Sequence, residues 1–220
     1  MPRKDLNFAV ECFLRVSDRR PEIIEKGRLE AFSDGVLAII ITIMVLELKV
    51  DHVQNPGFSD LNRLIPVFVS YVLSYIYIGI YWNNHHHLLH TAERINGAIL
   101  WANLYLLFWL SLVPFATNWL GRNQFAPAPT ALYGFVLLMA AVAYWILQRV
   151  IIGEHGPDSL LAKAVGRDIK GNLSLLIYLT AIGLSFVSAA IACGMYLLVA
   201  IIWLVPDRRI ERLIAKPKPA

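Results

Sequence analysis

The sequence is poor in charged residues and in cysteine. Only 16% of its 220 residues are charged, against about 25% in a typical soluble domain, whereas 57% are hydrophobic and the mean hydropathy is +0.56. A soluble domain of this size cannot bury so much apolar surface, so the sequence predicts a membrane protein and excludes a soluble enzyme domain or a folded ectodomain. Cys12 and Cys193 lie far apart in the sequence, which offers neither a disulfide framework nor a thiol metal site.

Six apolar segments follow a polar, basic start. They are expected at about 29–48, 63–82, 97–119, 131–152, 172–188 and 192–206. A membrane crossing needs about 20 residues, so the last two are short for two crossings. This spacing predicts an N-terminal arm at 1–27, one transmembrane domain at 28–206 and a basic tail at 207–220.

The distribution of Lys and Arg supports six crossings. With six helices, every Lys and Arg except Lys49, Arg63 and Arg122 lies on the side shared by the two termini. Merging the last two helices would move the basic tail to the opposite side. Because the cytoplasmic loops of membrane proteins carry an excess of Lys and Arg, the sequence predicts an all-α, six-span protein with both termini cytoplasmic.

The first apolar segment carries a carboxylate. Asp34 precedes an uncharged run, 36–46, that is too short to span a bilayer alone. Asp34 is therefore expected within the bilayer or at its edge, where an ionised carboxylate is costly unless paired and is usually functional. The alternative is a helix-start residue stabilised by the positive end of the helix dipole.

Helical phase divides this segment into stripes. At about 100° per residue, one stripe holds Arg28, Phe32, Gly35, Ile39, Thr42 and Leu46. Asp34, Ile41 and Val45 fall on another stripe, about 100° away. An apolar stripe with one hydroxyl is typical of ordinary helix packing, so the pattern alone does not specify a function.

The motif Arg28-x-x-x-Phe32-Ser33-Asp34-Gly35, followed by Ile39-x-x-Thr42-x-x-x-Leu46, resembles the first helix of the transmembrane-protein-175 family of potassium channels. The resemblance implies a homotetramer in which four copies of the first helix line one central pore. It implies a leak-type, voltage-independent channel in the cell membrane of a prokaryote, whose partners are potassium ions, the lipid bilayer and further copies of the chain. The sequence has no TVGYG-like selectivity loop, and neither a cofactor nor a nucleic-acid partner is expected.

The resemblance also assigns pore residues. Ile39 is expected to form a hydrophobic constriction, Thr42 a ring of hydroxyl oxygens, and Leu46 a further apolar ring, with Ile43 at the edge. An apolar neck can gate by dewetting, and hydroxyl oxygens can replace part of the hydration shell of a potassium ion.

A polar network is expected at the start of the pore helix. Its predicted members are Arg28, Phe32, Ser33, Asp34, Trp82, His85, His86 and Asn103, with Asn96 as a further candidate. The sequence leaves open which histidine takes part. Because histidine titrates near neutrality, such a network predicts a change of conductance between about pH 5 and 8. Four histidines in 85–90 also fit a metal site, but isolated histidine-rich tracts are only compositional evidence, and none is predicted.

Other functions remain open. One is a proton-permeable channel, and another is a proton-coupled transporter that uses Asp34 and the histidines of 85–90, although no inverted repeat is evident. A membrane metalloenzyme would need ligands on two helices, so no enzyme is expected. Pro114 predicts a kink in the third segment, and Gly171, Gly183 and Gly194 are expected to permit close helix packing.

Overall fold

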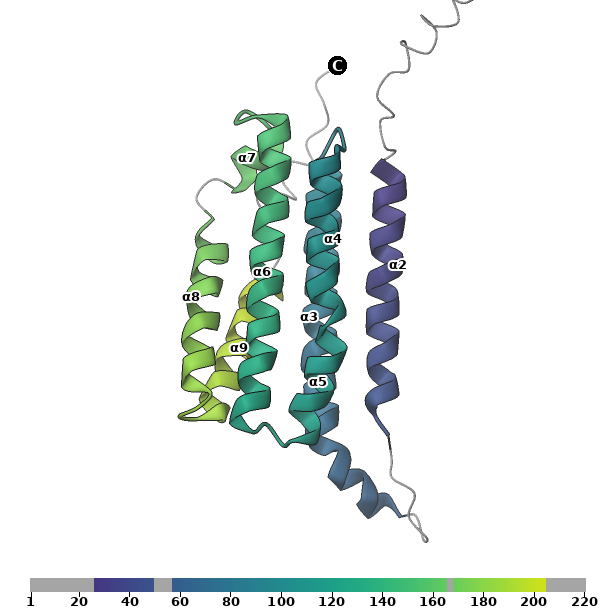
Figure 1. Ribbon diagram of the computed structural model, residues 1–220, viewed down its shortest axis with the longest axis vertical. Coiled ribbons are helices and arrows are strands. Elements are labelled where there is room, and N and C mark those ends of the chain that lie inside the picture. The colour runs from purple at the N-terminus through teal and green to yellow at the C-terminus, as the bar shows by residue number, and fades with distance from the viewer. Residues whose placement is uncertain (1–25, 50–56, 166–167, 205–220) are drawn as a thin grey trace, which may run out of the picture.

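The computed structural model describes residues 26–49, 57–165 and 168–204, and every element in these ranges is a helix (Figure 1). The elements are α2 (Lys26–Met44), η1 (Val45–Glu47), η2 (Phe58–Leu64), α3 (Ile65–His90), α4 (Gly97–Ser111), α5 (Val113–Arg122), α6 (Pro127–His155), α7 (Leu160–Val165), α8 (Ile169–Leu184) and α9 (Ala189–Leu204). Almost all of the predicted arm and the whole predicted tail lie outside the described residues. The all-helical class matches the prediction.

Four helical stretches are long and apolar enough to cross a membrane: Lys26–Glu47, Leu61–His90, Gly97–Arg122 and Pro127–His155. The protein is therefore a multi-pass membrane protein. The two remaining apolar helices, α8 and α9, have 16 residues each, or about 24 Å at 1.5 Å per residue. They are shorter than the hydrocarbon core of a bilayer, which is about 30 Å thick.

The second and third apolar segments differ in detail from their expected limits. Helix α3 continues to His90, eight residues beyond the expected end at 82, and so includes all four clustered histidines. The third segment breaks at Leu112, between α4 and α5, where Pro114 occupies the first turn of α5. Proline fits a first helical turn but lacks the N–H that an uninterrupted helix would need.

Helix α2 lies at one edge of the bundle and packs against α3, α4 and α5 (Figure 1). On the other side, α6 packs against α4, α8 and α9. Hydroxyl groups join the inner helices: Ser74 Oγ lies 2.6 Å from Thr117 Oγ1 and 3.0 Å from Tyr133 Oη. Bonds of this kind hold helices together in a membrane, where lipid removes most of the hydrophobic drive for association.

Close approach between helices depends on two glycines that the sequence did not single out. A methyl group at Gly121 would lie 2.5 Å from Ser70 Oγ, and one at Gly134 would overlap the hydroxyl group of Tyr196. By contrast, a methyl group at Gly183 or Gly194 would meet no atom of the described residues within 4 Å, so the prediction that these two permit close packing between helices of one chain was wrong.

Candidate functional site on helix α2

One face of α2 attaches the helix to the rest of its own chain. Its buried residues recur every three or four positions, as one helical face requires: Leu29, Ser33, Leu37, Ile40 and Met44. Four of these five side chains are apolar and pack into the core of the bundle. Ser33 is the one polar member.

Ser33 belongs to a buried chain of hydrogen bonds that joins three helices. Its hydroxyl donates to the carbonyl oxygen of Leu29, at 2.9 Å, so its oxygen accepts from Asn103 Nδ2, also at 2.9 Å. This orientation turns the Asn103 carbonyl oxygen toward His85 Nε2, 2.7 Å away, and His85 is therefore the donor. Ser33, His85 and Asn103 are almost completely buried, which makes each partner costly to lose.

Asp34 makes a separate contact one residue further along α2. Its carboxylate accepts a hydrogen bond of 3.0 Å from the indole nitrogen of Trp82 on α3. The ring of Trp82 stacks on His86, with 6.4 Å between centroids. Thus α3 bonds directly to α2 through the partly exposed Trp82, whereas the buried His85 reaches Ser33 only through Asn103 of α4.

Not every predicted member of the network joins it. Arg28 and Phe32 are exposed on the outer side of α2, and neither has a hydrogen bond to the network within the described part of the chain. Among the residues that the structure describes, His86 contacts the network through its ring contact with Trp82. Asn96 was a wrong candidate: it caps α4 by accepting from the Ile99 backbone N–H and donates to Glu154 on α6.

The opposite face of α2 is exposed. Ile39 is 57% exposed, Ile43 43% and Leu46 64%, and Thr42 lies in the same column. The column lies roughly 130° around the helix from the buried face, at about 100° per residue. Leu46 falls in the 3₁₀ turn η1 that follows α2, so it continues the column with a tighter local geometry than the sequence predicted.

Thr42 presents an oxygen atom rather than a proton to its surroundings. Its hydroxyl lies 3.0 Å from the carbonyl oxygens of both Ala38 and Ile39, which can only accept. The hydroxyl proton is therefore directed into the helix backbone. The lone pairs of the exposed oxygen are left to face water or a cation.

The geometry of α3 explains why His85 is the buried histidine. Ser70, Ser74 and Tyr77 are buried on α3 at spacings of three or four residues, and His85 continues that pattern two turns beyond Tyr77. Extending the helical phase past residue 82 would have identified it from the sequence. Within the described ranges, no group of three or more His, Cys, Asp or Glu side chains is placed to hold a metal ion.

Comparisons with known proteins agree with these features. Residues 28–114 match the family model described as the endosomal/lysosomal potassium channel TMEM175. A potassium channel of Chryseobacterium sp. (strain P1-3) is 56% identical over 187 residues, which cover 85% of this chain and 96% of the relative.

A solved structure is similar as well. The crystal structure titled as a lysosomal potassium-selective channel TMEM175 homolog from Chamaesiphon minutus aligns with a TM-score of 0.70 and 29% sequence identity, covering 83% of this chain and 98% of the other. The human endosomal/lysosomal proton channel TMEM175 is 36% identical over 98 residues, which are 40% of this chain and 19% of the human protein.

The similarity includes the network residues of all three helices, α2, α3 and α4, and spans nearly the full length of the bacterial relative. The chain is thus a prokaryotic member of the TMEM175 family of ion channels and not an enzyme.

Proposed function

We propose that the protein is a potassium-selective, leak-type channel in which four copies of α2 surround a central pore. The observation that carries this proposal is the exposed column on α2, formed by Ile39, Thr42, Ile43 and Leu46, opposite the face that binds the helix to its own chain. The printed names of the bacterial relatives, which call them potassium channels, support the choice of ion.

Each position in the column has a distinct physical role in this proposal. Ile39 forms an apolar neck that excludes water and ions when it is narrow. Thr42 lies one turn further along, about 4.5 Å by the helix rise, and offers four hydroxyl oxygens to a partly dehydrated potassium ion. A neutral hydroxyl oxygen holds a monovalent ion weakly enough to release it. Leu46 forms a second apolar ring, with Ile43 at the edge of the column.

The polar network holds the start of the pore helix in this proposal. The bonds of Ser33 and Asp34 to α4 and α3 fix the position and rotation of α2 near its first turns. A rotation of the helix would move Ile39 away from the axis, so the network defines which residues face the pore.

The proposal includes six crossings with both termini cytoplasmic, in the plasma membrane of a prokaryote. The main helices alternate in direction, and α2 begins on the side toward which α9 runs (Figure 1). The concentration of Lys and Arg on that side supports a cytoplasmic assignment.

A flux assay tests the function directly. The purified protein is reconstituted into potassium-loaded liposomes, and potassium efflux is measured without any coupling ion. We expect passive efflux from the wild-type protein and an increase of about tenfold in Ile39→Asn, which corresponds to about 1.4 kcal/mol off the barrier. Leu176→Asn is the matched control, because Leu176 is equally apolar and 62% exposed but lies on α8. Equal leaks in the two variants would contradict a neck at Ile39.

Native mass spectrometry tests the assembly. A tetramer has four times the 24.8 kDa mass of one chain. A predominant dimer would contradict a pore lined by four copies of α2.

Proton permeation is a second candidate, favoured by the printed name of the vertebrate relatives, which are called proton channels. The same liposomes, loaded with a pH-sensitive dye and given a pH gradient without potassium, separate the two ions. If the pH gradient dissipates as fast as potassium leaves the liposomes in the first assay, protons are favoured as the permeant ion. A proton-coupled transporter would instead require potassium and proton fluxes in a fixed ratio.

A further inference from the structure

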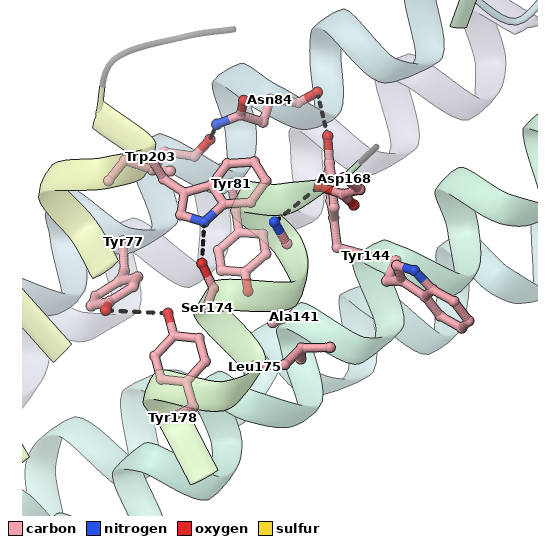
Figure 2. A pocket seen from close by; sticks show the side chains of 13 residues that line it. Tyr77, Tyr81, Asn84, Ala141, Tyr144, Asp168, Ser174, Leu175, Tyr178 and Trp203 are labelled. Carbon is pink, nitrogen blue, oxygen red and sulfur yellow. Dashed lines mark hydrogen bonds between the residues drawn. The ribbon is translucent and has the colours of Figure 1, made fainter. Parts of the chain in front are cut away.

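A narrow crevice lies on the far side of the bundle from the exposed column of α2. It is bounded by α3, α6, α8 and α9, and α2 contributes no residue to it (Figure 2). It encloses about 560 Å³ that no protein atom fills, part of which is open to the surface. Only about 40 Å³ of this space admits the centre of a water-sized sphere, so the crevice fits a slender molecule rather than a bulky one.

The walls of the crevice are mostly apolar and aromatic, and many of their polar groups are already paired. Trp203 Nε1 donates to Ser174 Oγ at 2.8 Å, and Tyr178 Oη donates to Tyr77 Oη at 3.2 Å. These bonds leave the rings to present their faces and edges to the crevice (Figure 2). An apolar chain could therefore enter the crevice without leaving these polar groups buried and unpaired.

Polarity changes along α8. Asp168 caps the start of this helix, and Tyr178 lies ten residues further on, about 15 Å by the helix rise. One oxygen of Asp168 accepts from the Gly171 backbone N–H at 2.9 Å. Within the described part of the chain, neither the second carboxylate oxygen nor the Tyr81 hydroxyl, which lines the crevice, has a hydrogen-bond partner.

The chemistry of this arrangement selects a cation with an apolar chain. The carboxylate repels an anionic head group, whereas an ammonium group donates hydrogen bonds to it and is attracted by neighbouring aromatic rings. Trp145, on the α6 wall, has the guanidinium of Arg149 5.4 Å from its ring centroid, although Arg149 itself is exposed and does not line the crevice.

We propose that this crevice binds a single-chain primary alkylamine, with the ammonium group at Asp168 and the chain directed toward Tyr178. The site is separate from the pore, so its occupancy does not depend on the proposed channel function.

Quenching of tryptophan fluorescence tests the proposal, because Trp145 and Trp203 line the crevice. The full chain in phosphatidylcholine liposomes is titrated with a brominated decylamine, and brominated decanoic acid and decanol serve as probes of equal chain and different charge. We expect a saturable component with the amine alone. Asp168→Asn should weaken the amine's apparent affinity by about tenfold, as expected for the loss of a charge-assisted hydrogen bond.

Two further variants make the result specific. Asparagine caps a helix as well as aspartate, so Asp168→Asn keeps the bond from Gly171 and the start of α8. Asp158→Asn, at a carboxylate that is almost fully exposed outside the crevice, should leave the affinity unchanged. Ala141→Phe, which places a ring in the crevice, should abolish saturation.

Several outcomes would overturn the proposal. They are equal saturation by the amine and the acid, unchanged affinity in Asp168→Asn, saturation that persists in Ala141→Phe, and purely linear quenching by all three probes, which would show simple partitioning into lipid.

Discussion

Ser33 and Thr42 are two hydroxyl residues on the same helix in opposite situations. Each donates its proton to a carbonyl oxygen one turn earlier in α2. Ser33 is completely buried, and its oxygen accepts a hydrogen bond from Asn103 on α4. Thr42 is exposed, and its oxygen accepts from no group in the described part of the chain. The local bond is the same, so the surroundings alone make one hydroxyl structural and leave the other available to a ligand.

The largest expected effect comes from removing the buried hydrogen bonds that involve Ser33. Asn103→Leu removes the partner of both Ser33 and His85 and should lower the free energy of unfolding by about 2 kcal/mol. The thermal unfolding midpoint in detergent measures the loss. Asn172→Leu, the same substitution at an exposed position of α8, is the control and should stay within about 0.5 kcal/mol. Equal midpoints for the two variants would show that the buried chain contributes no net stability.

The exposed hydroxyl should affect ion preference instead of stability. Thr42→Val keeps the shape of the side chain but removes its oxygen, and we expect the preference for potassium over sodium to fall about fivefold, or about 1 kcal/mol. Liposome flux with each ion measures the ratio, and the unfolding midpoint should remain that of the wild-type protein. An unchanged ratio would remove Thr42 as the selectivity element.

A smaller effect is expected at the partly exposed contact. Trp82→Phe removes the indole N–H that donates a hydrogen bond to Asp34. The free energy of unfolding should fall by about 0.5–1 kcal/mol, because water can replace the lost donor. Trp101→Phe, on an indole that is 76% exposed, provides the comparison in the same unfolding experiment. A loss at Trp82 as large as that in Asn103→Leu would mean that Asp34 is as critical as Ser33.

The smallest effect is expected from Thr42→Ser. Serine retains the hydroxyl oxygen and the same bond to the helix backbone, so the potassium-to-sodium ratio should match that of the wild-type protein within error. A ratio as low as that of Thr42→Val would indicate that the methyl group, and not the oxygen, determines selectivity.

Hydropathy and helical phase predicted much of the fold. The six apolar segments each coincide with helical structure, and the predicted stripe of Ile39, Thr42 and Leu46 is exposed, although the buried face of α2 is not the other predicted stripe, of Asp34, Ile41 and Val45. These features depend on residues close together in the sequence, where the 3.6-residue period is sufficient. The same reasoning ended the second helix too early, because a run of polar histidines does not look like a membrane helix.

Contacts between distant residues were harder to predict. The sequence offered both Asn103 and, as a further candidate, Asn96. Asn96 lies at the start of α4 and bonds to Glu154, while Asn103 lies two turns further on, at the depth of Ser33. Relative depth depends on how α4 is positioned against α2 and α6, and no local pattern contains that information. For the same reason, the crevice between α3, α6, α8 and α9 had no sequence signal.

The two crowded glycines bear on how a genetic screen of this protein should be interpreted. Any side chain at Gly121 or Gly134 collides with a neighbouring helix, although both positions are far along the chain from the proposed pore. A selection for growth would therefore discard most alleles at these two sites, whereas a Cβ atom at Gly183 or Gly194 meets no atom within 4 Å in the described part of the chain. Intolerance to mutation at 121 and 134 would record a steric requirement of assembly and should not be mistaken for a part in ion passage.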